Sequence, residues 1–229
     1  MLSLLKTFGL YLVLNVSAFL MLKIIVQYWA FDDHVGFLEF KQDYLHLKLW
    51  KAAFYIHVFS SIFTLLAGFT QFSSEILKNH RGLHKLIGKI YVWDIVLINF
   101  PTGLILAVYA NGHLPTKIAF LILDGLWLWF TVKAVIEVKK GNIAGHREYM
   151  IRSYALTFSA VTLRTWRLVL TSSFDLDLQL IYMLDAWLGF VPNLICAEWL
   201  IARNRKNRSA PESAALTDRH HREHKDHDQ

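Results

Sequence analysis

The sequence predicts an all-α integral membrane protein, a bundle of six transmembrane helices with both termini in the cytoplasm. Two observations lead to this prediction. Hydrophobic residues make up 55% of the 229-residue chain, and they gather in long blocks rather than singly. Lysine and arginine are concentrated in alternate connections between these blocks. Neither pattern is typical of a soluble domain.

Each of the six blocks is long enough to cross a bilayer, which takes about 20 helical residues. The blocks are Phe8 to Ala30, Lys51 to Phe72, Gly88 to Ala110, Ile118 to Val138, Met150 to Phe174 and Ile181 to Arg203. They fill most of residues 1–203, which we predict to form one transmembrane domain. The first block resembles a secretory signal, but its apolar core is too long and it lacks a small-residue cleavage site. We therefore predict a retained first helix.

The charges of the connections predict the orientation of the helices. Basic residues crowd the second and fourth connections and the start of the tail: Lys78, Arg81, Lys85, Lys89, Lys139, Lys140, Arg147, Arg152, Arg203, Arg205, Lys206 and Arg208. The first and fifth connections carry acidic residues instead, among them Asp32, Asp33, Asp175 and Asp177. Because cytoplasmic loops are enriched in lysine and arginine, we predict a multi-pass protein of the cell inner membrane with both ends inside. The net charge of +6 reflects this bias. No motif indicates nucleic-acid binding.

The end of the chain differs in composition from the six blocks. From Asn204 it turns polar and finishes in a histidine-rich run over residues 218–228. We predict a disordered cytoplasmic tail over residues 204–229. Clustered histidines can bind metal ions weakly, but a solvated tail is the expectation. The only cysteine, Cys196, lies inside the sixth block, so we expect no disulfide and no cysteine-based metal site.

Two of the blocks contain a polar stripe when drawn as helices. At 100° per residue, His146, Ser153, Thr157 and Arg164 fall within roughly 20° of one line. A second stripe starts at His57 and continues through Ser60, Ser61, Thr64, Gly68 and Gln71. Hydroxyl groups and glycine commonly serve only to let membrane helices pack closely. A charged group in hydrocarbon costs roughly 2.5 kcal/mol or more unless it is paired, so His57 and Arg164 need a further reason.

Depth in the membrane divides the ionisable residues into two groups. His57, Asp124 and Arg164 each lie roughly 9 to 15 Å below the outer surface at 1.5 Å per residue. Asp185 lies a little higher, and we predict an outer cluster in which the acids offset Arg164. An inner group contains Asp94, Glu198, Arg152, His146 and His84. On an ideal sixth helix Asp185 and Glu198 point to nearly opposite faces, although Pro192 can bend it.

Several short sequence blocks form a distinctive set: LHKLIGKIY at 83–91, HREYMIRSYAL at 146–156, VTLR at 161–164 and AEW at 197–199, together with His57, Gly68, Gln71 and Asn193. This set resembles a bacterial family of predicted membrane proteins catalogued as a domain of unknown function. The resemblance covers roughly residues 50 to 200 and implies a membrane bundle without indicating its chemistry. The chain departs from the family pattern at Lys85 and Lys89, where arginine is usual, and at Tyr149, where tryptophan is usual.

The first functional hypothesis is a redox protein that binds haem b or a quinone. Histidines on facing helices can ligate a haem within a bundle, and arginines can receive its propionates. His84 and His146 form the candidate pair, with Arg152, Arg81 or Arg147 within reach of propionates. This layout is similar to that of diheme transmembrane cytochromes b. His57 has no histidine at its own depth, so a second, outer haem lacks a ligand.

Two further hypotheses remain open. A membrane-embedded enzyme would use His57 or Asp124 as proton donor or acceptor, and Arg164 would bind an anionic or carbonyl oxygen of a lipophilic substrate. A small transporter would use the polar stripes as a track, but the sequence contains no inverted repeat. We place the redox hypothesis first. Lipid and a lipophilic small molecule or quinone are the expected partners, and the sequence leaves the oligomeric state open.

Overall fold

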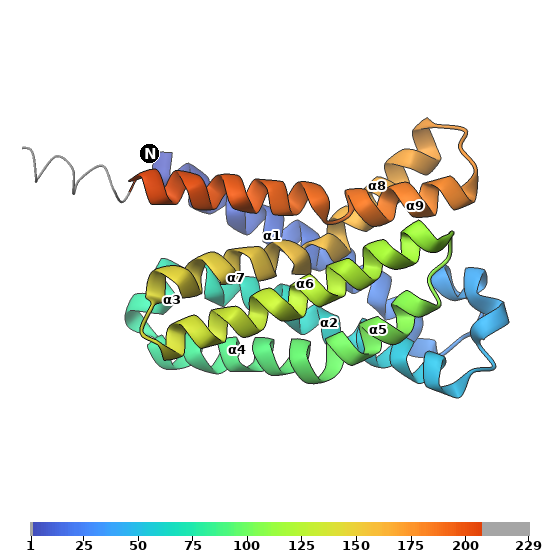
Figure 1. Ribbon diagram of the computed structural model, residues 1–229, viewed down its shortest axis with the longest axis horizontal. Helices are drawn as coiled ribbons and strands as arrows, with labels where there is room; N and C mark the ends of the chain where they lie inside the picture. The colour runs from blue at the N-terminus through green and yellow to red at the C-terminus, as the bar shows by residue number, and fades with distance from the viewer. Residues whose placement is uncertain (1, 208–229) are drawn as a thin grey trace, which may run out of the picture.

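The computed structural model describes residues 2–207, and within that range the chain folds into helices without strands (Figure 1). The predicted all-α class is confirmed for this part of the chain. The elements are α1 (Leu2–Val26), η1 (Gln27–Ala30), η2 (Gly36–Tyr44), α2 (Lys48–Gln71), α3 (Ser74–Asn79), α4 (Arg81–Asp94), η3 (Ile95–Asn99), α5 (Phe100–Val108), α6 (Leu114–Lys139), α7 (Ile143–Thr157), α8 (Ser159–Ser173) and α9 (Leu178–Leu188). A last helix covers residues 191–207.

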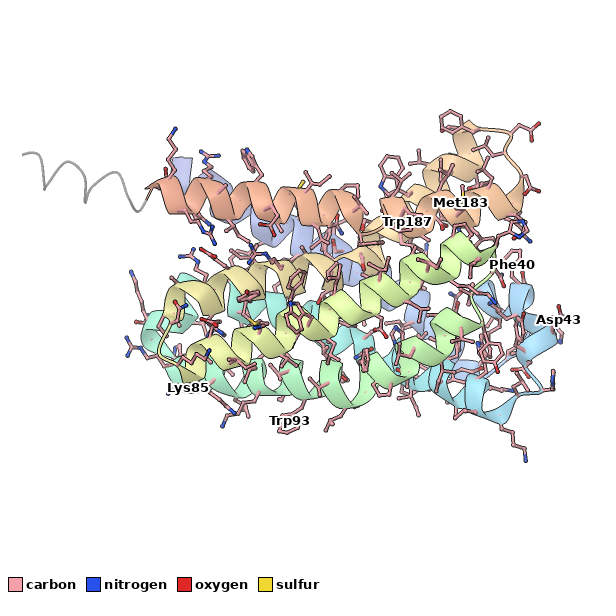
Figure 2. All side chains as sticks on the ribbon, in the orientation of Figure 1. Phe40, Asp43, Lys85, Trp93, Met183 and Trp187 are labelled. Carbon is pink, nitrogen blue, oxygen red and sulfur yellow. The ribbon has the colours of Figure 1, made fainter. Side chains whose placement is uncertain are left out.

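Five stretches of the described chain are long and apolar enough to cross a membrane. They are Tyr11–Ala30, Lys48–Gln71, Arg81–Val108, Leu114–Lys139 and Leu178–Asn207. Large hydrophobic side chains on these helices face outward, as Trp93 does in Figure 2. Several long helices with outward-facing apolar side chains are the pattern of a multi-pass membrane protein in contact with the bilayer.

The predicted fifth crossing, Met150 to Phe174, is not one continuous helix. It is divided at Phe158 into α7 and α8, which have 15 residues each. Figure 1 shows that α7 lies within the bundle, whereas α8 rises away from it and pairs with α9. The predicted stripe therefore ends at this break: Ser153 and Thr157 are buried, but Arg164 on α8 is exposed.

The core of the bundle is a ring of four segments. In this ring α4 packs on α2, α5 on α6, α6 on α7 and α7 on α2. Consequently α4 and α7 lie on one diagonal, and α2 and α6 lie on the other (Figure 1). α1 packs on the outside of α2, and α9 packs on α6. The interior contains mainly aliphatic and aromatic side chains, with Tyr91, Ile95 and Leu156 among the most deeply buried.

The two ends of the bundle differ in charge and structure. The beginning of α1, the short helix α3 and the end of helix 191–207 lie together at the end where Lys85 is found (Figures 1 and 2). The opposite end is covered by η1 and η2, where Asp43 lies. There Tyr28, Leu38 and Trp50 belong to a second buried cluster that joins this cover to α2.

The segment from α4 to α5 contains a π-helix at Ile95–Asn99. The wider turn places Asp94 and Asn99, at its two edges, in buried positions. Pro101 lies in the first turn of α5, directly after this π-helix, and cannot donate a backbone hydrogen bond there. π-helical turns within α-helices are frequent at functional sites.

The last segment bends at Gly189 and Phe190, between α9 and helix 191–207. A side chain at residue 189 would meet the backbone oxygen of Asp185 at 2.9 Å and Leu163 at 3.0 Å, so glycine permits this close approach. Because of the bend, Asp185 and Glu198 both face the α7–α8 segment. The helix continues four residues past the predicted boundary at residue 203, because Asn204 to Asn207 remain helical. The predicted tail from residue 208 onward lies outside the described residues.

Candidate functional site

A hydroxyl cluster occupies the diagonal between α4 and α7. The Tyr91 hydroxyl is 2.7 Å from the Ser153 hydroxyl and 2.8 Å from that of Thr157. Thr131 and Trp127 on α6 join the cluster, with contacts of 2.7 Å to Ser153 and 3.1 Å to Thr157. Each of these buried groups has a hydrogen-bond partner, as buried polar groups in stable interiors do. The cluster therefore joins three helices, and none of its side chains is left without a hydrogen-bond partner.

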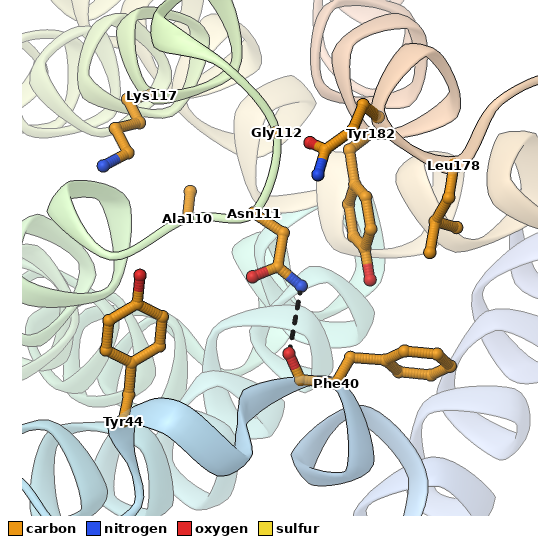
Figure 3. A pocket seen from close by; sticks show the side chains of 9 residues that line it. Phe40, Tyr44, Ala110, Asn111, Gly112, Lys117, Leu178 and Tyr182 are labelled. Atoms are coloured by element: carbon orange, nitrogen blue, oxygen red, sulfur yellow. Dashed lines mark hydrogen bonds between the residues drawn. The ribbon is translucent and has the colours of Figure 1, made fainter.

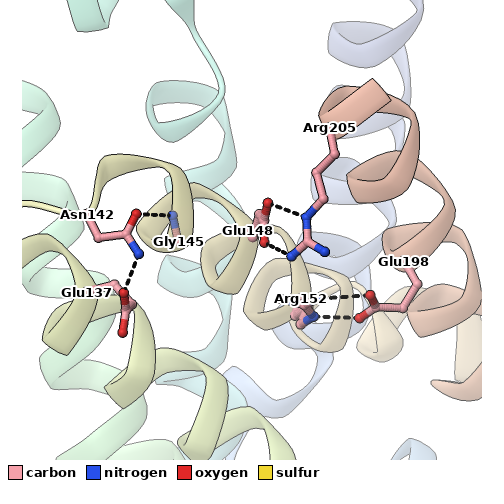
Figure 4. Close-up of polar contacts among 7 residues, drawn as sticks. All are labelled: Glu137, Asn142, Gly145, Glu148, Arg152, Glu198 and Arg205. Carbon is pink, nitrogen blue, oxygen red and sulfur yellow. Dashed lines mark hydrogen bonds and ion pairs between the residues drawn. The ribbon is translucent and has the colours of Figure 1, made fainter. Parts of the chain in front are cut away.

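Three ion pairs, the arginine ladder, join the α7–α8 segment to the last segment of the chain. They are Arg152 with Glu198, Arg205 with Glu148, and Arg167 with Asp185. The first two are two-point pairs of a guanidinium with a carboxylate (Figure 4). Arg152, which the sequence suggested for a propionate, is thus engaged by Glu198. Asp185 is paired with Arg167 rather than with the predicted Arg164.

The inner histidines lie at corresponding positions on the two helices of the α4–α7 diagonal. His84 lies seven residues before Tyr91, and His146 lies seven before Ser153. Seven helical residues make nearly two full turns and about 10 Å of rise, so each histidine shares the face of its partner in the hydroxyl cluster. Since Tyr91 and Ser153 touch, we expect the histidines to lie on the facing sides of α4 and α7, two turns away from that contact. The charges of His84 and His146 also interact.

Local structure fixes the position of each inner histidine. Asn142 caps α7 by accepting a hydrogen bond from the Gly145 N–H at 2.9 Å, and it donates to Glu137 (Figure 4). This cap places His146 in the first turn, where its Nδ1 is 2.9 Å from the Ala134 carbonyl oxygen. A carbonyl can only accept, so Nδ1 carries a proton, and in the neutral ring this leaves the lone pair on Nε2.

The His84 ring lies close to the α2–α4 contact. Its ring is next to the carbonyl of Thr70, and Gln71 donates to the backbone oxygen of His84 at 3.1 Å. The buried Nδ1 of His84 has no hydrogen-bond partner in the described structure. A buried imidazole nitrogen without a partner is costly unless something else binds there.

The outer polar group consists of His57 and Asp124, which lie on the two sides of α5. His57 on α2 contacts the Thr102 hydroxyl through Nδ1 at 3.2 Å. Asp124 on α6 lies against Gly103, where an added side chain would be 2.8 Å from a carboxylate oxygen. The structure thus brings His57 and Asp124 to neighbouring residues of one helix. The Oδ2 atom of Asp124 is buried and has no partner among the described residues.

Arg164 does not complete the predicted outer cluster. It donates to the Ala160 carbonyl on its own helix, and no acid of the described chain pairs with it. Its charge acts on His57, so the two lie within electrostatic range of each other. The predicted charge compensation of Arg164 by Asp124 and Asp185 is therefore wrong.

Residues 54–201 match the family described as predicted membrane proteins (DUF2306). The chain belongs to this family. The match confirms the resemblance seen in the sequence, and its range includes His57, His84, Asp124, His146 and Arg164. No curated protein and no solved structure matches the chain.

Two further residues of interest in this DUF2306 protein, Asn99 and Arg167, were not predicted from the sequence. Asn99 is fully buried, and its Nδ2 has no partner in the described structure, although Ser60 approaches Oδ1 at 3.5 Å. Its signal in the sequence is an amide in an apolar block five residues after Asp94. Arg167 was not predicted because the fifth crossing was assumed to be one straight helix. Its signal in the sequence is its depth, since Arg167 lies nearer than Arg164 to the depth predicted for Asp185.

The described part of this DUF2306 protein contains no group of three or more histidine, cysteine, aspartate or glutamate side chains that could hold a metal ion. Structural metal ions such as zinc almost always take four ligands. The inner site offers two imidazoles, and the outer polar group offers one imidazole and one carboxyl group. Two imidazoles suit a prosthetic group that brings its own ligands to the metal. An imidazole near a carboxyl group suits proton transfer.

Proposed function

We propose that this DUF2306 protein is a membrane redox protein that binds one haem b between His84 and His146. The observation that supports it most is the histidine pair across the α4–α7 diagonal, with Nδ1 of His146 bonded to a backbone carbonyl. Ligating histidines usually donate their second ring N–H in this way, which fixes the ring and leaves Nε2 for the metal. A porphyrin supplies its own nitrogens to iron, so two protein ligands are enough.

The residues around the pair have separate roles in this proposal. Ala134 and Thr70 supply carbonyl groups beside the two rings, and the hydroxyl cluster sets the distance between α4 and α7. Arg152 is engaged by Glu198, so we assign the propionates to other arginines. Arg81 and Arg147 are exposed near the same end and can receive them. Haem b supplies one-electron transfer, and a lipophilic quinone from the bilayer is the expected electron partner.

The proposal includes a topology of six crossings with both ends in the cytoplasm. In it α7 and α8 together make the fifth crossing, with a bend at Phe158. The lysine-rich end near Lys85 faces the cytoplasm, following the enrichment of basic residues on that side. A reporter domain fused after Asp177, in the α8–α9 connection, is expected to read as outside. A cytoplasmic reading there would contradict this orientation.

Absorption spectroscopy of the protein purified with haem available tests the proposed cofactor. We expect a Soret band and split α bands after reduction. His84→Ala and His146→Ala should each remove the signal, because one histidine cannot replace the other across the diagonal. His80→Ala, at an exposed histidine of the same end, should leave it unchanged. A colourless protein, or full haem content in both inner variants, would overturn the proposal.

A second candidate function rests on the unpartnered carboxylate oxygen of Asp124. We propose as the alternative an acid and base site for a lipophilic substrate, with His57 and Asp124 exchanging protons and Arg164 binding an anionic oxygen. Its test is mass spectrometry of lipophilic compounds extracted from wild-type protein and from His57→Ala. A compound retained by the wild type alone would favour it, and identical extracts would count against it.

A further inference from the structure

The edges of the π-helical turn carry an acid and an amide that each have one buried polar atom left unbonded. Asp94 is 7% exposed and Asn99 is fully buried. Oδ2 of Asp94 and Nδ2 of Asn99 have no hydrogen-bond partner among the described residues. A carboxylate oxygen accepts hydrogen bonds, whereas an amide nitrogen donates them. Because burying both unbonded is costly, a group that donates and accepts belongs beside them.

The wider turn brings these two side chains together. In an α-helix, residues five apart point about 140° away from each other. Here the Phe100 N–H donates to the Ile95 carbonyl, which is the five-residue bond of a π-helix, so residues five apart come closer to one face. The Asn99 side chain lies beside the Asp94 carboxyl and interacts with it. A continuous α-helix would not provide this pairing.

The same asparagine also contacts the face of α2 that carries His57. The His57 ring lies next to the Asn99 backbone carbonyl, and its Nδ1 is 3.2 Å from the Thr102 hydroxyl. Ser60, one turn further along α2, has its Oγ 3.5 Å from Oδ1 of Asn99. The backbone of Asn99 therefore faces the imidazole, and its side chain faces Ser60 and Asp94. These contacts make one polar column from His57 through Asn99 to Asp94.

A cavity of about 320 Å³ between η2, the α5–α6 connection and α9 does not offer such a set (Figure 3). Lys117 and Tyr182 line it from opposite sides of the stretch 110–111. Asn111 is already bonded to the Phe40 carbonyl at 3.3 Å. The polar groups of this cavity therefore do not converge on one point, whereas the open donor and acceptor at the π-helical turn are adjacent.

The chemistry of the open atoms selects water as the group beside them. A buried water molecule commonly makes about three hydrogen bonds to polar protein groups. Oδ2 of Asp94, Nδ2 of Asn99 and the Ser60 hydroxyl can supply them, since the two contacts of that hydroxyl are long, 3.4 Å and 3.5 Å. A metal ion does not suit the position, because the amide N–H of Asn99 cannot ligate it.

We infer that an ordered water at the π-helical turn relays protons between His57 and Asp94, which makes Asp94 a proton acceptor for this histidine. In the transfer, a ring N–H bond of the His57 imidazolium breaks and its proton passes to the water. The water gives another proton to Oδ2 of Asp94, so a neutral imidazole and a carboxylic acid result. The inference rests on the acid and base role proposed for His57 and adds Asp94 to it.

Hydrogen exchange of the His57 ring N–H tests the inference. The full chain, labelled with ¹⁵N-histidine, is studied by NMR in nanodiscs, and the signal lost in His57→Gln identifies the ring. In the wild type we expect measurable exchange of this proton with bulk water. Asp94→Asn should slow it about 10-fold or more, because an amide cannot take up the proton. Asn99→Leu should slow it similarly, because the side chain fills the position of the water.

Asp43→Asn is the control, because Asp43 is an exposed aspartate outside the column, and its exchange rate should equal that of the wild type. If Asn99→Leu does not fold, Asp94→Asn decides alone, since it keeps the shape of the side chain. Equal exchange in Asp94→Asn and the wild type would overturn the inference, as would the absence of exchange in the wild type. Slowing by Asp124→Asn instead of Asp94→Asn would also overturn it. The measurement needs neither haem nor substrate, so its failure is distinct from failure of the proposed functions.

Discussion

The arginine ladder and the outer polar group both place ionisable residues inside the bundle, but they differ in how completely their atoms are bonded. Asp185 in the ladder is fully buried, and its Oδ2 is paired with the Arg167 guanidinium, although its Oδ1 has no partner among the described residues. Asp124 in the outer polar group is also buried, but it forms no ion pair with the described residues, and its Oδ2 has no hydrogen-bond partner there. A bonded polar group stabilises helix contacts, whereas an unbonded one costs stability that only another role explains. The difference separates scaffold from candidate site.

The largest expected effect comes from the ladder. Arg167→Leu leaves the Asp185 carboxylate buried without its partner, which should lower the free energy of unfolding by about 3 to 5 kcal/mol. Arg164→Leu removes a charge that no acid compensates, so its stability should change by less than about 1 kcal/mol. Thermal unfolding of both variants in the same detergent measures the difference. Equal destabilisation would show that Arg164 is also paired.

The comparison between Arg164 and Arg167 also shows what the sequence could predict. Helical periodicity placed His146, Ser153 and Thr157 on one inward face, and in the structure Ser153 and Thr157 are buried there. It failed beyond Phe158, because no glycine or proline announces the break that rotates α8 relative to α7. The tertiary pairing of Arg167 with Asp185 depends on that rotation and on the bend at Gly189, so helical periodicity alone could not select it.

Other parts of the site followed directly from the sequence. The seven-residue spacing that relates His84 to Tyr91 and His146 to Ser153 is visible in the chain. The similar depths of His57 and Asp124 were predicted by counting residues along the helices. The contacts of His57 with Thr102 and of Asp124 with Gly103 could not be predicted in this way, because they depend on how α2, α5 and α6 pack around the π-helix.

A smaller effect is expected where two helices touch. A side chain at Gly68 would overlap the Tyr154 hydroxyl, which donates to the Leu65 carbonyl at 2.7 Å. Gly68→Ala should therefore lower stability by about 1 to 3 kcal/mol through overpacking and loss of that bond. Gly125→Ala is the control, since nothing lies within 4 Å of the added carbon. Similar unfolding midpoints for the two variants would contradict the described contact.

The hydroxyl cluster and Asp124 should respond in opposite ways. Ser153→Ala leaves the Tyr91 and Thr131 hydroxyls with one bond fewer, which should cost about 1 to 2 kcal/mol. Asp124→Asn removes a buried carboxyl group that lacks a full set of partners, so stability should stay the same or rise slightly. Chemical denaturation of the two variants tests this. Strong destabilisation by Asp124→Asn would place Asp124 in the scaffold.

The least pronounced effect concerns Lys41, a buried cation without an acidic partner. Its folded pKa of about 8 lies below the usual value of 10.5, so the unfolded chain binds more protons between these values. Stability should therefore rise as the pH increases from about 8 toward 10.5. Lys41→Met should remove this part of the rise and leave other contributions in place. An unchanged pH profile in the variant would show that Lys41 does not titrate in this window.

Measuring haem content and apoprotein stability on the same preparations of His84→Ala and Arg167→Leu tests the separation of site from scaffold most directly. We predict that His84→Ala loses haem while its apoprotein unfolds near the wild-type midpoint, because the His84 Nδ1 has no partner to lose. Arg167→Leu should unfold at a much lower temperature, with the folded fraction still binding haem. Full haem binding by His84→Ala, or wild-type stability of Arg167→Leu, would contradict this account.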